Sequence, residues 1–197
     1  GKSWSLPIFT INKPHFILNS GLFGDSIHVL ATISPVELYH VNGDNDLNEI
    51  VFMIKNASNE INLQFLSYNP NTKEGYWEEI DTALISASKR GVKVRLLVSD
   101  WNLGKTAVEH FKTLISYANF EVKYTEIPEY SGGFIPYARV EHCKFITADT
   151  ICWIGTSNMS RDYFYESRNV GLIVENGRFT QRVRDIFYKS WNSEYAK

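Results

Sequence analysis

Residues 142–158 read HCKFITADTICWIGTSN. The stretch contains two short apolar runs, residues 143–147 and 150–154, which are separated by Ala148 and Asp149. Apolar runs of this length on either side of a small polar pair predict two strands joined by a tight turn. Strands joined by so short a turn run antiparallel, so at least part of the sheet that contains them is antiparallel.

Around this stretch the chain alternates between patterns typical of helices and patterns typical of strands. Apolar residues recur every three or four positions in the predicted helices, at residues 46–55, 76–90, 105–117 and 180–191. Apolar and β-branched runs predict strands at residues 60–68, 92–99, 120–127 and 170–174. Such alternation favours an α/β sandwich. We therefore predict an α/β fold whose mixed β-sheet is flanked by helices on both faces.

The composition is that of an ordinary globular protein. The 197 residues are 44% hydrophobic and 21% charged, with a formal net charge of -2. The absence of a global basic excess means that a nucleic-acid ligand would be held by a local patch. Aromatic residues make up 14% of the chain, which fits either a core rich in large rings or a groove that stacks bases. Two cysteines are too few for a disulfide scaffold, and no apolar run is long enough to span a membrane.

His142 and Lys144 are the residues with the clearest chemical meaning. Residues two apart on a strand point to the same face, so the spacing predicts that an imidazole and an ammonium share one groove. A neutral imidazole can attack phosphorus, and an ammonium can neutralise the phosphate oxygens in the transition state. After the turn, Ser157 and Asn158 can supply further donors, whereas Asp149 is expected to stabilise the turn itself. A His beside a Lys on a strand is more often a surface pair without function, and only the downstream pattern favours a site.

That pattern resembles a known motif. His142 is followed by Lys144, by Asp149 and then by Gly-Thr-Ser-Asn at 155–158, and this order is similar to the HKD motif of the phospholipase D superfamily. The wider strings at 135–144, 90–97 and 191–195 resemble one branch, the endolysosomal phospholipase D-like 5'-exonucleases of animals and their poxvirus relatives. The likeness is to the second of their two HKD halves and covers roughly residues 46–195. The spacer between Asp149 and Gly155 is shorter than in the general superfamily pattern.

The resemblance implies a set of site residues. The implied catalytic residues are His142, Lys144, Asn158, Asp149 and Glu166. For Glu166, orientation of a histidine and an ordinary surface carboxylate are equally open. The implied substrate-binding residues are Tyr137, Arg139 and Ser157, although a packed tyrosine and a strand-edge arginine fit the first two as well. For Trp101, which follows a predicted buried strand, we expect core packing. Neither a metal nor a cofactor is implied.

The resemblance also implies a function and a partner. The expected activity is metal-independent phosphodiesterase chemistry through a phospho-histidine intermediate, most simply as a nuclease on single-stranded DNA or RNA. The alternatives are a phospholipase D or phosphatidyltransferase that acts on phospholipid, and a degenerate half with a binding or structural role.

The superfamily chemistry needs two HKD motifs, and the other four histidines here lack the lysine and aspartate of a second one. The partner is then an N-terminal half of a longer chain or a second copy in a homodimer. Residues 1–44, with one predicted strand at 27–33, resemble the connector between halves, and residues 45–197 resemble the phospholipase D-like catalytic half. The animal branch implies an endolysosomal or secretory lumen; otherwise the compartment is the cytoplasm.

Overall fold

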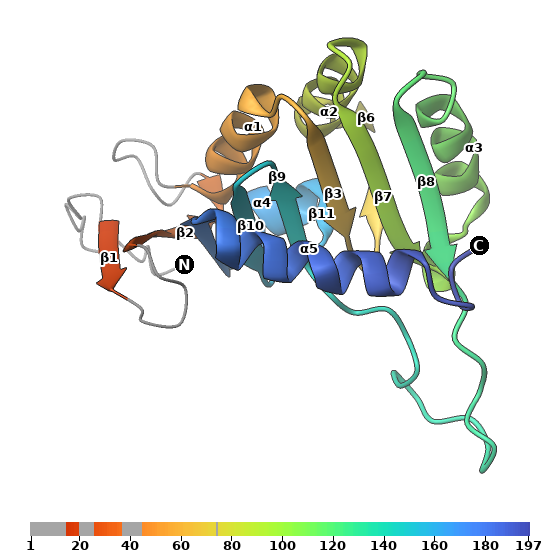
Figure 1. Cartoon of the computed structure of the whole chain (residues 1–197). Helices are drawn as coiled ribbons and strands as arrows, with labels where there is room; N and C mark the ends of the chain where they lie inside the picture. Colours follow the sequence, from red (N-terminus) through yellow and green to blue (C-terminus); the bar gives the residue numbers. More distant parts are fainter. Residues whose placement is uncertain (1–14, 20–25, 37–44, 74) are drawn as a thin grey trace, which may run out of the picture.

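A single eight-stranded sheet organises the computed structural model, which describes residues 15–19, 26–36, 45–73 and 75–197 (Figure 1). Its strand order is β1-β2-β12-β10-β9-β3-β7-β8. These strands are β1 His15–Asn19, β2 Ser26–Ser34, β3 Glu60–Gln64, β7 Lys93–Ser99, β8 Phe120–Thr125, β9 Phe145–Ala148, β10 Ile151–Gly155 and β12 Asn169–Glu175. Strands β3, β7 and β8 pair in parallel, and the other neighbours pair antiparallel. The prediction of a mixed sheet is confirmed.

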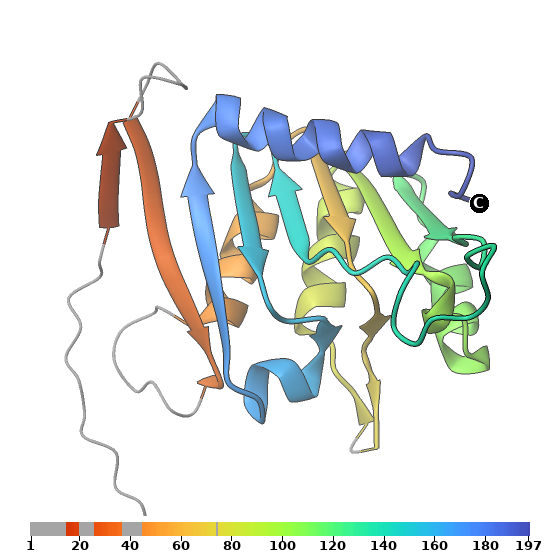
Figure 2. The same cartoon turned by 90° about the horizontal axis from the view of Figure 1, so that it is seen from below.

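Helices cover both faces of this sheet, as predicted (Figures 1 and 2). One face carries α1 Asp46–Asn56, α2 Glu79–Lys89 and α3 Lys105–Leu114. The other face carries α5 Gly177–Trp191, which runs across the middle strands. Smaller elements complete the described fold: the 3-10 turn η2 Asp100–Asn102, the helix α4 Arg161–Tyr165, and the short strands β4 Tyr68–Asn69, β5 Asn71–Thr72, β6 Gly75–Tyr76 and β11 Met159–Ser160.

The two helical layers bury two separate apolar cores. Adjacent residues of a strand face opposite sides, so Ile146 belongs to the core beneath α1 and α2, whereas Phe145 belongs to the core beneath α5. On α5, Val183, Phe187 and Trp191 recur every four residues and form the buried stripe. Both faces of the sheet therefore carry a core, and Ile154, Val170 and Leu172 of β10 and β12 stay exposed outside it.

Two helix starts follow from capping side chains. The Asn45 side chain accepts a hydrogen bond from the backbone N–H of Asn48 at 2.8 Å and caps α1. The Asn176 side chain accepts one from the backbone N–H of Phe179 at 2.9 Å and caps α5. Because a capping oxygen satisfies a donor that the helix leaves free, each helix begins at the residue after its asparagine.

The structure corrects some predicted boundaries. The strand expected at residues 60–68 ends at Gln64, because Tyr68 leaves the main sheet and pairs with β11. The helix expected from residue 76 begins at Glu79, because Tyr76 pairs with Asn71 instead. The helix expected from residue 180 begins at Gly177, directly after its Asn176 cap.

The described residues before residue 45 contribute two strands where one was expected. Strand β2 pairs with β12 over seven registered residue pairs and is an integral part of the sheet. Strand β1 pairs with β2 and lies at the border of the sheet. The rest of the expected connector, residues 1–14, 20–25 and 37–44, lies outside the described residues.

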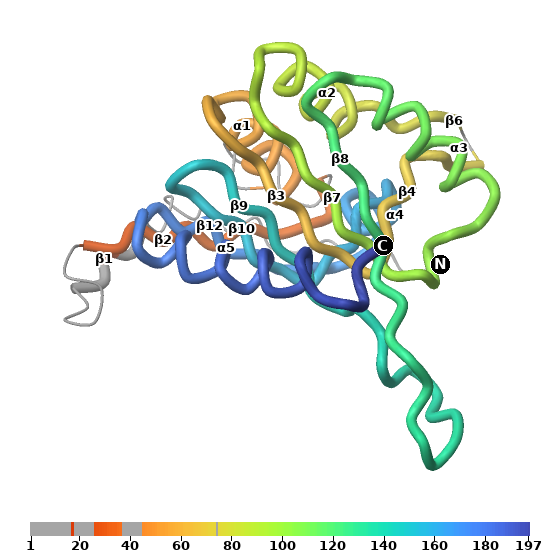
Figure 3. The backbone as a smooth tube through the Cα atoms, turned by 45° about the vertical axis from the view of Figure 1, so that its right-hand side comes forward, coloured from red at the N-terminus to blue at the C-terminus, as the bar shows by residue number. Residues whose placement is uncertain are grey.

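One end of the sheet gathers the segments that matter for function. The strands β3, β7, β8 and β10 all terminate there, and β9 begins there. We call it the site end. The segment between β8 and β9 extends away from the sheet at this end (Figures 1 and 3). Open α/β sheets usually bind ligands outside the carboxyl ends of their strands. None of the helices in the described ranges is long and apolar enough to cross a bilayer.

Candidate active site

His142 and Lys144 lie side by side at the site end. Lys144 Nζ is 3.3 Å from His142 Nε2, and it also donates to the backbone carbonyl of His142 at 3.2 Å. His142 is exposed, and Lys144 is half-buried. Which of the two groups donates in this contact depends on the tautomer of the imidazole. The spacing argument correctly placed the two groups together.

The sequence predicted that the two residues lie on a strand, but in the structure they do not. Strand β9 begins at Phe145, one residue after Lys144. The backbone N–H of Cys143 donates to the Glu141 carboxylate at 3.2 Å, which interrupts regular strand pairing. Lys144 stays attached to the sheet, because its carbonyl accepts from the backbone N–H of Gly155 at 3.1 Å. His142 and Lys144 therefore lie in the short segment directly before β9.

Burial makes the ammonium of Lys144 less stable than in water. Desolvation lowers the pKa of Lys144, and the nearby Cys143 and Glu141 oppose that shift. An ammonium that has lost part of its hydration gains more from a phosphate oxygen than a fully solvated one. The environment thus favours an anionic ligand against Lys144.

Ser157 and Asn158 follow β10 and reach the same end of the sheet. Both side chains are buried, at 0% and 3% exposure. Asn158 Nδ2 donates to the Tyr163 hydroxyl at 3.0 Å, whereas Asn158 Oδ1 and Ser157 Oγ have no hydrogen-bond partner within the described part of the chain. An unpaired buried polar atom costs about 1–3 kcal/mol. Two such atoms together favour a site that a ligand or a second protein half completes.

Tyr163 contacts Asn158 directly, and the motif alone did not identify it. Its hydroxyl accepts from Asn158, and its carbonyl accepts from Asn169 Nδ2 at 2.9 Å and Ser34 Oγ at 3.0 Å. These contacts tie α4 to β2 and β12, so the tyrosine is a fixed support for Asn158. In the sequence, Tyr163 is marked only by its position five residues after Asn158, the last residue of the motif.

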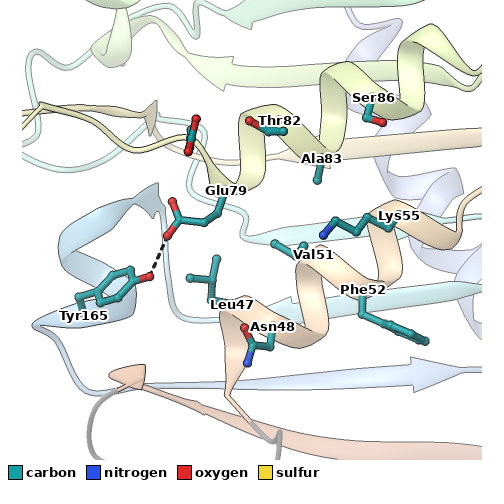
Figure 4. A pocket seen from close by; sticks show the side chains of 11 residues that line it. Leu47, Asn48, Val51, Phe52, Lys55, Glu79, Thr82, Ala83, Ser86 and Tyr165 are labelled. Atoms are coloured by element: carbon teal, nitrogen blue, oxygen red, sulfur yellow. Dashed lines mark hydrogen bonds between the residues drawn. The ribbon is translucent and has the colours of Figure 1, made fainter.

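Helix α2 supports the two segments that follow Asn158. The backbone of β4 pairs with β11, directly after Asn158, and the Tyr68 hydroxyl of β4 donates to the buried carboxylate of Asp81. The Tyr165 hydroxyl of α4 donates to Glu79 Oε1 at 2.8 Å (Figure 4). Two carboxylates in the first turn of one helix thus anchor β11, through β4, and α4.

Asp149 lies at the opposite end of β9 from His142 and Lys144. Its carboxylate accepts from the backbone N–H groups of Ser58, Asn59 and Glu60 at 2.7, 3.0 and 3.1 Å. Burial alone would raise its pKa, but these backbone hydrogen bonds outweigh burial and the pKa of Asp149 is lowered. The structure places Asp149 as a turn and loop anchor and does not bring it to the catalytic pair.

Glu166, Arg139 and Tyr137 each contact a different part of the chain and do not line one groove with His142. The exposed Glu166 carboxylate pairs with Arg161 Nη1 at 3.0 Å, and no contact joins it to His142 in the described ranges. Arg139 Nε donates to the carbonyl of Pro128 and closes the base of the loop before the motif. Tyr137 is 87% exposed and contacts Trp101.

The expectation that Trp101 packs in the core is wrong. Its ring is 48% exposed. Ser99 Oγ accepts from the backbone N–H of Trp101 at 3.2 Å and starts η2, which turns the chain away from the sheet directly after β7. The tryptophan therefore lies beyond the strand end and not beneath it.

A pocket of about 650 Å³ lies elsewhere, between α1 and α2 (Figure 4). Val51, Phe52 and Lys55 line it from α1, and Glu79, Thr82 and Ala83 line it from α2. His142, Lys144 and Asn158 do not line it. In the described ranges no cluster of three or more His, Cys, Asp or Glu side chains is placed to hold a metal ion.

Comparisons with known proteins agree with this geometry. The family model described as "Cardiolipin synthase, PLD-like domain" matches residues 50–191. Phospholipase D Y of Dictyostelium discoideum is 33% identical over 172 residues, which are 84% of this chain and 39% of that protein. The 5'-3' exonuclease PLD4 of Mus musculus is 33% identical over 184 residues, 83% of this chain and 37% of that protein.

The fold is also found in a solved structure. NucT from Helicobacter pylori superposes with a TM-score of 0.69 at 19% identity, covering 86% of this chain and 98% of that one. The chain therefore spans less than two fifths of the length of these two curated relatives, at 39% and 37%. It covers nearly all of the solved NucT chain, which has the same fold.

Proposed function

The chain belongs to the phospholipase D-like domain family, and we propose that it supplies one HKD half of a phosphodiesterase that cleaves single-stranded nucleic acid. The observation that carries the proposal is the contact of 3.3 Å between His142 Nε2 and Lys144 Nζ at the site end. A nucleophile and a cation at one point suit attack on a phosphodiester.

The proposed reaction has two balanced steps. In the first, the lone pair of one histidine, written here as His142, forms a bond to phosphorus while the bond from phosphorus to the leaving oxygen breaks. The histidine of the second half donates its proton to that oxygen. In the second step water loses a proton to the second histidine and bonds to phosphorus, and the bond from phosphorus to His142 breaks. Exchanging the roles of the two histidines leaves the balance unchanged.

Lys144, Ser157 and Asn158 are proposed to bind the phosphate oxygens during both steps. Lys144 contributes charge, and the Ser157 hydroxyl contributes a donor that has no partner in the described ranges. Asn158 Nδ2 already donates one hydrogen to Tyr163, so its second hydrogen is the donor left for a phosphate oxygen. Arg139 and Tyr137 are proposed to border the substrate. Because the positive charge comes from lysines, turnover is expected to persist in excess chelator. Asp149 acts on this site only through the turn that it holds, and we assign Glu166 no separate step.

The second half is needed because this chain has one HKD motif. In an arrangement like the longer relatives, an N-terminal half would supply the other motif, and residues 1–44 would lead from it into the domain. The other arrangement is a homodimer, in which a second copy of the chain supplies the other motif. Both place two copies of the chemistry opposite each other across a twofold or pseudo-twofold axis.

Nucleic acid as the substrate is supported by the exonuclease relative, and phospholipid by the relative named phospholipase D. The discriminating experiment offers the assembled protein a single-stranded oligonucleotide and phospholipid vesicles in parallel. We expect turnover of the oligonucleotide. Turnover of phospholipid alone would replace the nuclease with the lipid enzyme.

The catalytic assignment is tested with His142→Ala. The variant removes either the nucleophile or the general acid, and acid assistance alone contributes about 10²–10⁴ in rate. We expect oligonucleotide turnover to fall by at least that factor, whereas His28→Ala, a change at an exposed histidine of β2, leaves it unchanged. Turnover within a few fold of wild type in His142→Ala would mean that this half has only a binding or structural role.

A further inference from the structure

Two exposed aromatic rings meet at the site end. Trp101 and Tyr137 are 48% and 87% exposed, and their ring centroids are 6.2 Å apart at an interplanar angle of 64°. Trp101 follows β7, and Tyr137 lies in the segment that leads into His142. We call them the aromatic pair. An edge-to-face contact of this kind fixes the rings relative to each other and leaves ring surface open to solvent.

The backbone turns Tyr137 outward at a cost. Tyr137 has φ 59° and Arg139 has φ 55°, both in the left-handed region that residues with a side chain seldom occupy. A residue in this region is strained, and strain of this kind persists where the surrounding structure holds it. Here the Arg139 side chain donates to the Pro128 carbonyl, and the backbone N–H of Ala138 donates to the carbonyl of Ile135 at 3.2 Å. The ring is therefore held out by a built loop.

The chemistry of the pair favours a flat neutral ring as its ligand. Bases of single strands stack favourably on aromatic side chains, and this contact requires no charge. The segment from residue 128 to 141 carries Glu129 and Glu141 against one cation, Arg139. It lacks the cluster of lysines and arginines with which proteins bind anionic lipid surfaces.

We infer that Trp101 and Tyr137 form a stacking platform for the nucleobase next to the phosphate that His142 and Lys144 bind. The inference rests on the proposed nuclease function and adds to it a subsite that recognises the base and not the phosphate. In this arrangement His142 and Lys144 bind the phosphate backbone of the nucleic acid, and the aromatic pair makes the site prefer a nucleotide that carries a base.

The test crosses protein variants with a substrate that lacks one base. A single-stranded decathymidylate is compared with the same oligomer carrying an abasic residue at the first or the last nucleotide in turn. We expect Tyr137→Ala and Trp101→Ala to lower kcat/KM on the intact oligomer by roughly tenfold, mainly through KM. On the oligomer whose abasic residue lies at the cleaved end, the variants and wild type should be equal, because the ring has no base to stack on. Tyr137→Phe, which keeps the ring, should retain wild-type kcat/KM.

Phe134→Ala is the matched control. Phe134 lies in the same loop and is 69% exposed, but it does not belong to the aromatic pair. It should leave kcat/KM on both oligomers unchanged. Equal losses in Tyr137→Ala on the intact and the abasic oligomers would overturn the stacking platform.

Two other outcomes would also overturn it. If the pair variants lose assembly with the second half, as measured by light scattering, the pair is a protein interface. If they lose sedimentation with phospholipid vesicles instead, it is a membrane contact. Wild-type protein that cleaves neither oligomer would overturn the nuclease proposal as well, which distinguishes that failure from a failure of the subsite alone.

Discussion

The Tyr163 hydroxyl accepts one hydrogen bond of 3.0 Å from the side chain of Asn158, which is buried. Removal of the hydroxyl in Tyr163→Phe leaves the Asn158 amide without this partner and free to rotate. One neutral hydrogen bond contributes about 0.5–1.5 kcal/mol, so the thermal midpoint should fall only slightly. We expect kcat on an oligonucleotide to fall by about tenfold, because fixed placement of donors is a large part of transition-state stabilisation.

The control for this prediction is Tyr195→Phe, which removes a hydroxyl from a half-buried tyrosine near the end of the chain. It should leave kcat unchanged. If Tyr163→Phe shifts the thermal midpoint as expected and kcat stays at the wild-type value, Tyr163 has no positioning role.

We expect Lys144 to be needed for activity and to lower the stability of the fold. Burial lowers the pKa of Lys144 in the folded chain, so unfolding takes up protons at pH values between the folded and unfolded pKa. Stability therefore rises with pH in that window, and the buried charge weakens the fold below it. Lys144→Met should raise the thermal midpoint at neutral pH by about 1–3 °C and abolish turnover.

The comparison variant is Lys93→Met, which removes an exposed lysine at the start of β7. It should change neither property. The alkaline limb of kcat/KM in the wild type should fall at a lower pH than an ordinary lysine would give. A midpoint that drops in Lys144→Met would contradict the desolvation argument.

At the scale of elements, the turn between β9 and β10 depends on Asp149. Its carboxylate accepts three backbone N–H groups from the segment between α1 and β3, and Asp149 itself has φ 49°. Asp149→Ala should lower the free energy of unfolding by about 1–3 kcal/mol near neutral pH, measured by urea denaturation. Because Asp149 lies at the end of β9 away from His142, kcat should stay within about threefold of wild type, as expected of a change outside the chemistry.

The pH dependence gives this prediction a second readout. The folded-state pKa of Asp149 is lowered, so its contribution is present above the usual carboxyl range and is lost as the pH falls through the folded pKa. The difference in stability between wild type and Asp149→Ala should shrink in acid, whereas Glu194→Ala, at an exposed carboxylate, should show no such trend. Loss of kcat without loss of stability would assign Asp149 to the chemistry instead.

The same scale shows where sequence patterns suffice and where they fail. Short apolar runs located β9 and β10, and apolar residues at three- and four-residue spacing located α5, because burial determines which residues are apolar. They failed at Tyr68 and Tyr76, because short strands that pair outside the main sheet have no periodicity to read. They also failed at the start of β9, where one side chain, Glu141, takes the amide of Cys143.

At the scale of the whole molecule, motif spacing predicted the contact of His142 with Lys144 but not the surroundings of the pair. The exposure of Trp101 depends on how η2 turns at the strand end, and the role of Tyr163 depends on how α4 folds back on β12. Both depend on how the chain turns directly after a strand or before one, which apolar periodicity does not report. Glu166 carried the least information, because a carboxylate near the motif fits a surface pair with Arg161 equally well.

At the same scale, we propose that the chain forms only part of an active site. Ser157 Oγ and Asn158 Oδ1 are buried without partners in the described ranges, and one HKD motif provides one histidine for two proton-linked roles. An unprotonated alkoxide is a poor leaving group, so a lone half loses general acid assistance along with the charge of the second lysine. Assembly with another motif is therefore the central requirement of the account.

The most direct test measures oligonucleotide turnover against protein concentration while light scattering records the mass of the same samples. This chain, kept monomeric and free of any other chain, should be inactive, and turnover should appear only with a species that contains a second HKD motif. In a homodimer, mixing His142→Ala chains with wild type should lower turnover as the mutant fraction rises. Full turnover from a species proven to be a monomer, with no other chain present, would contradict the account.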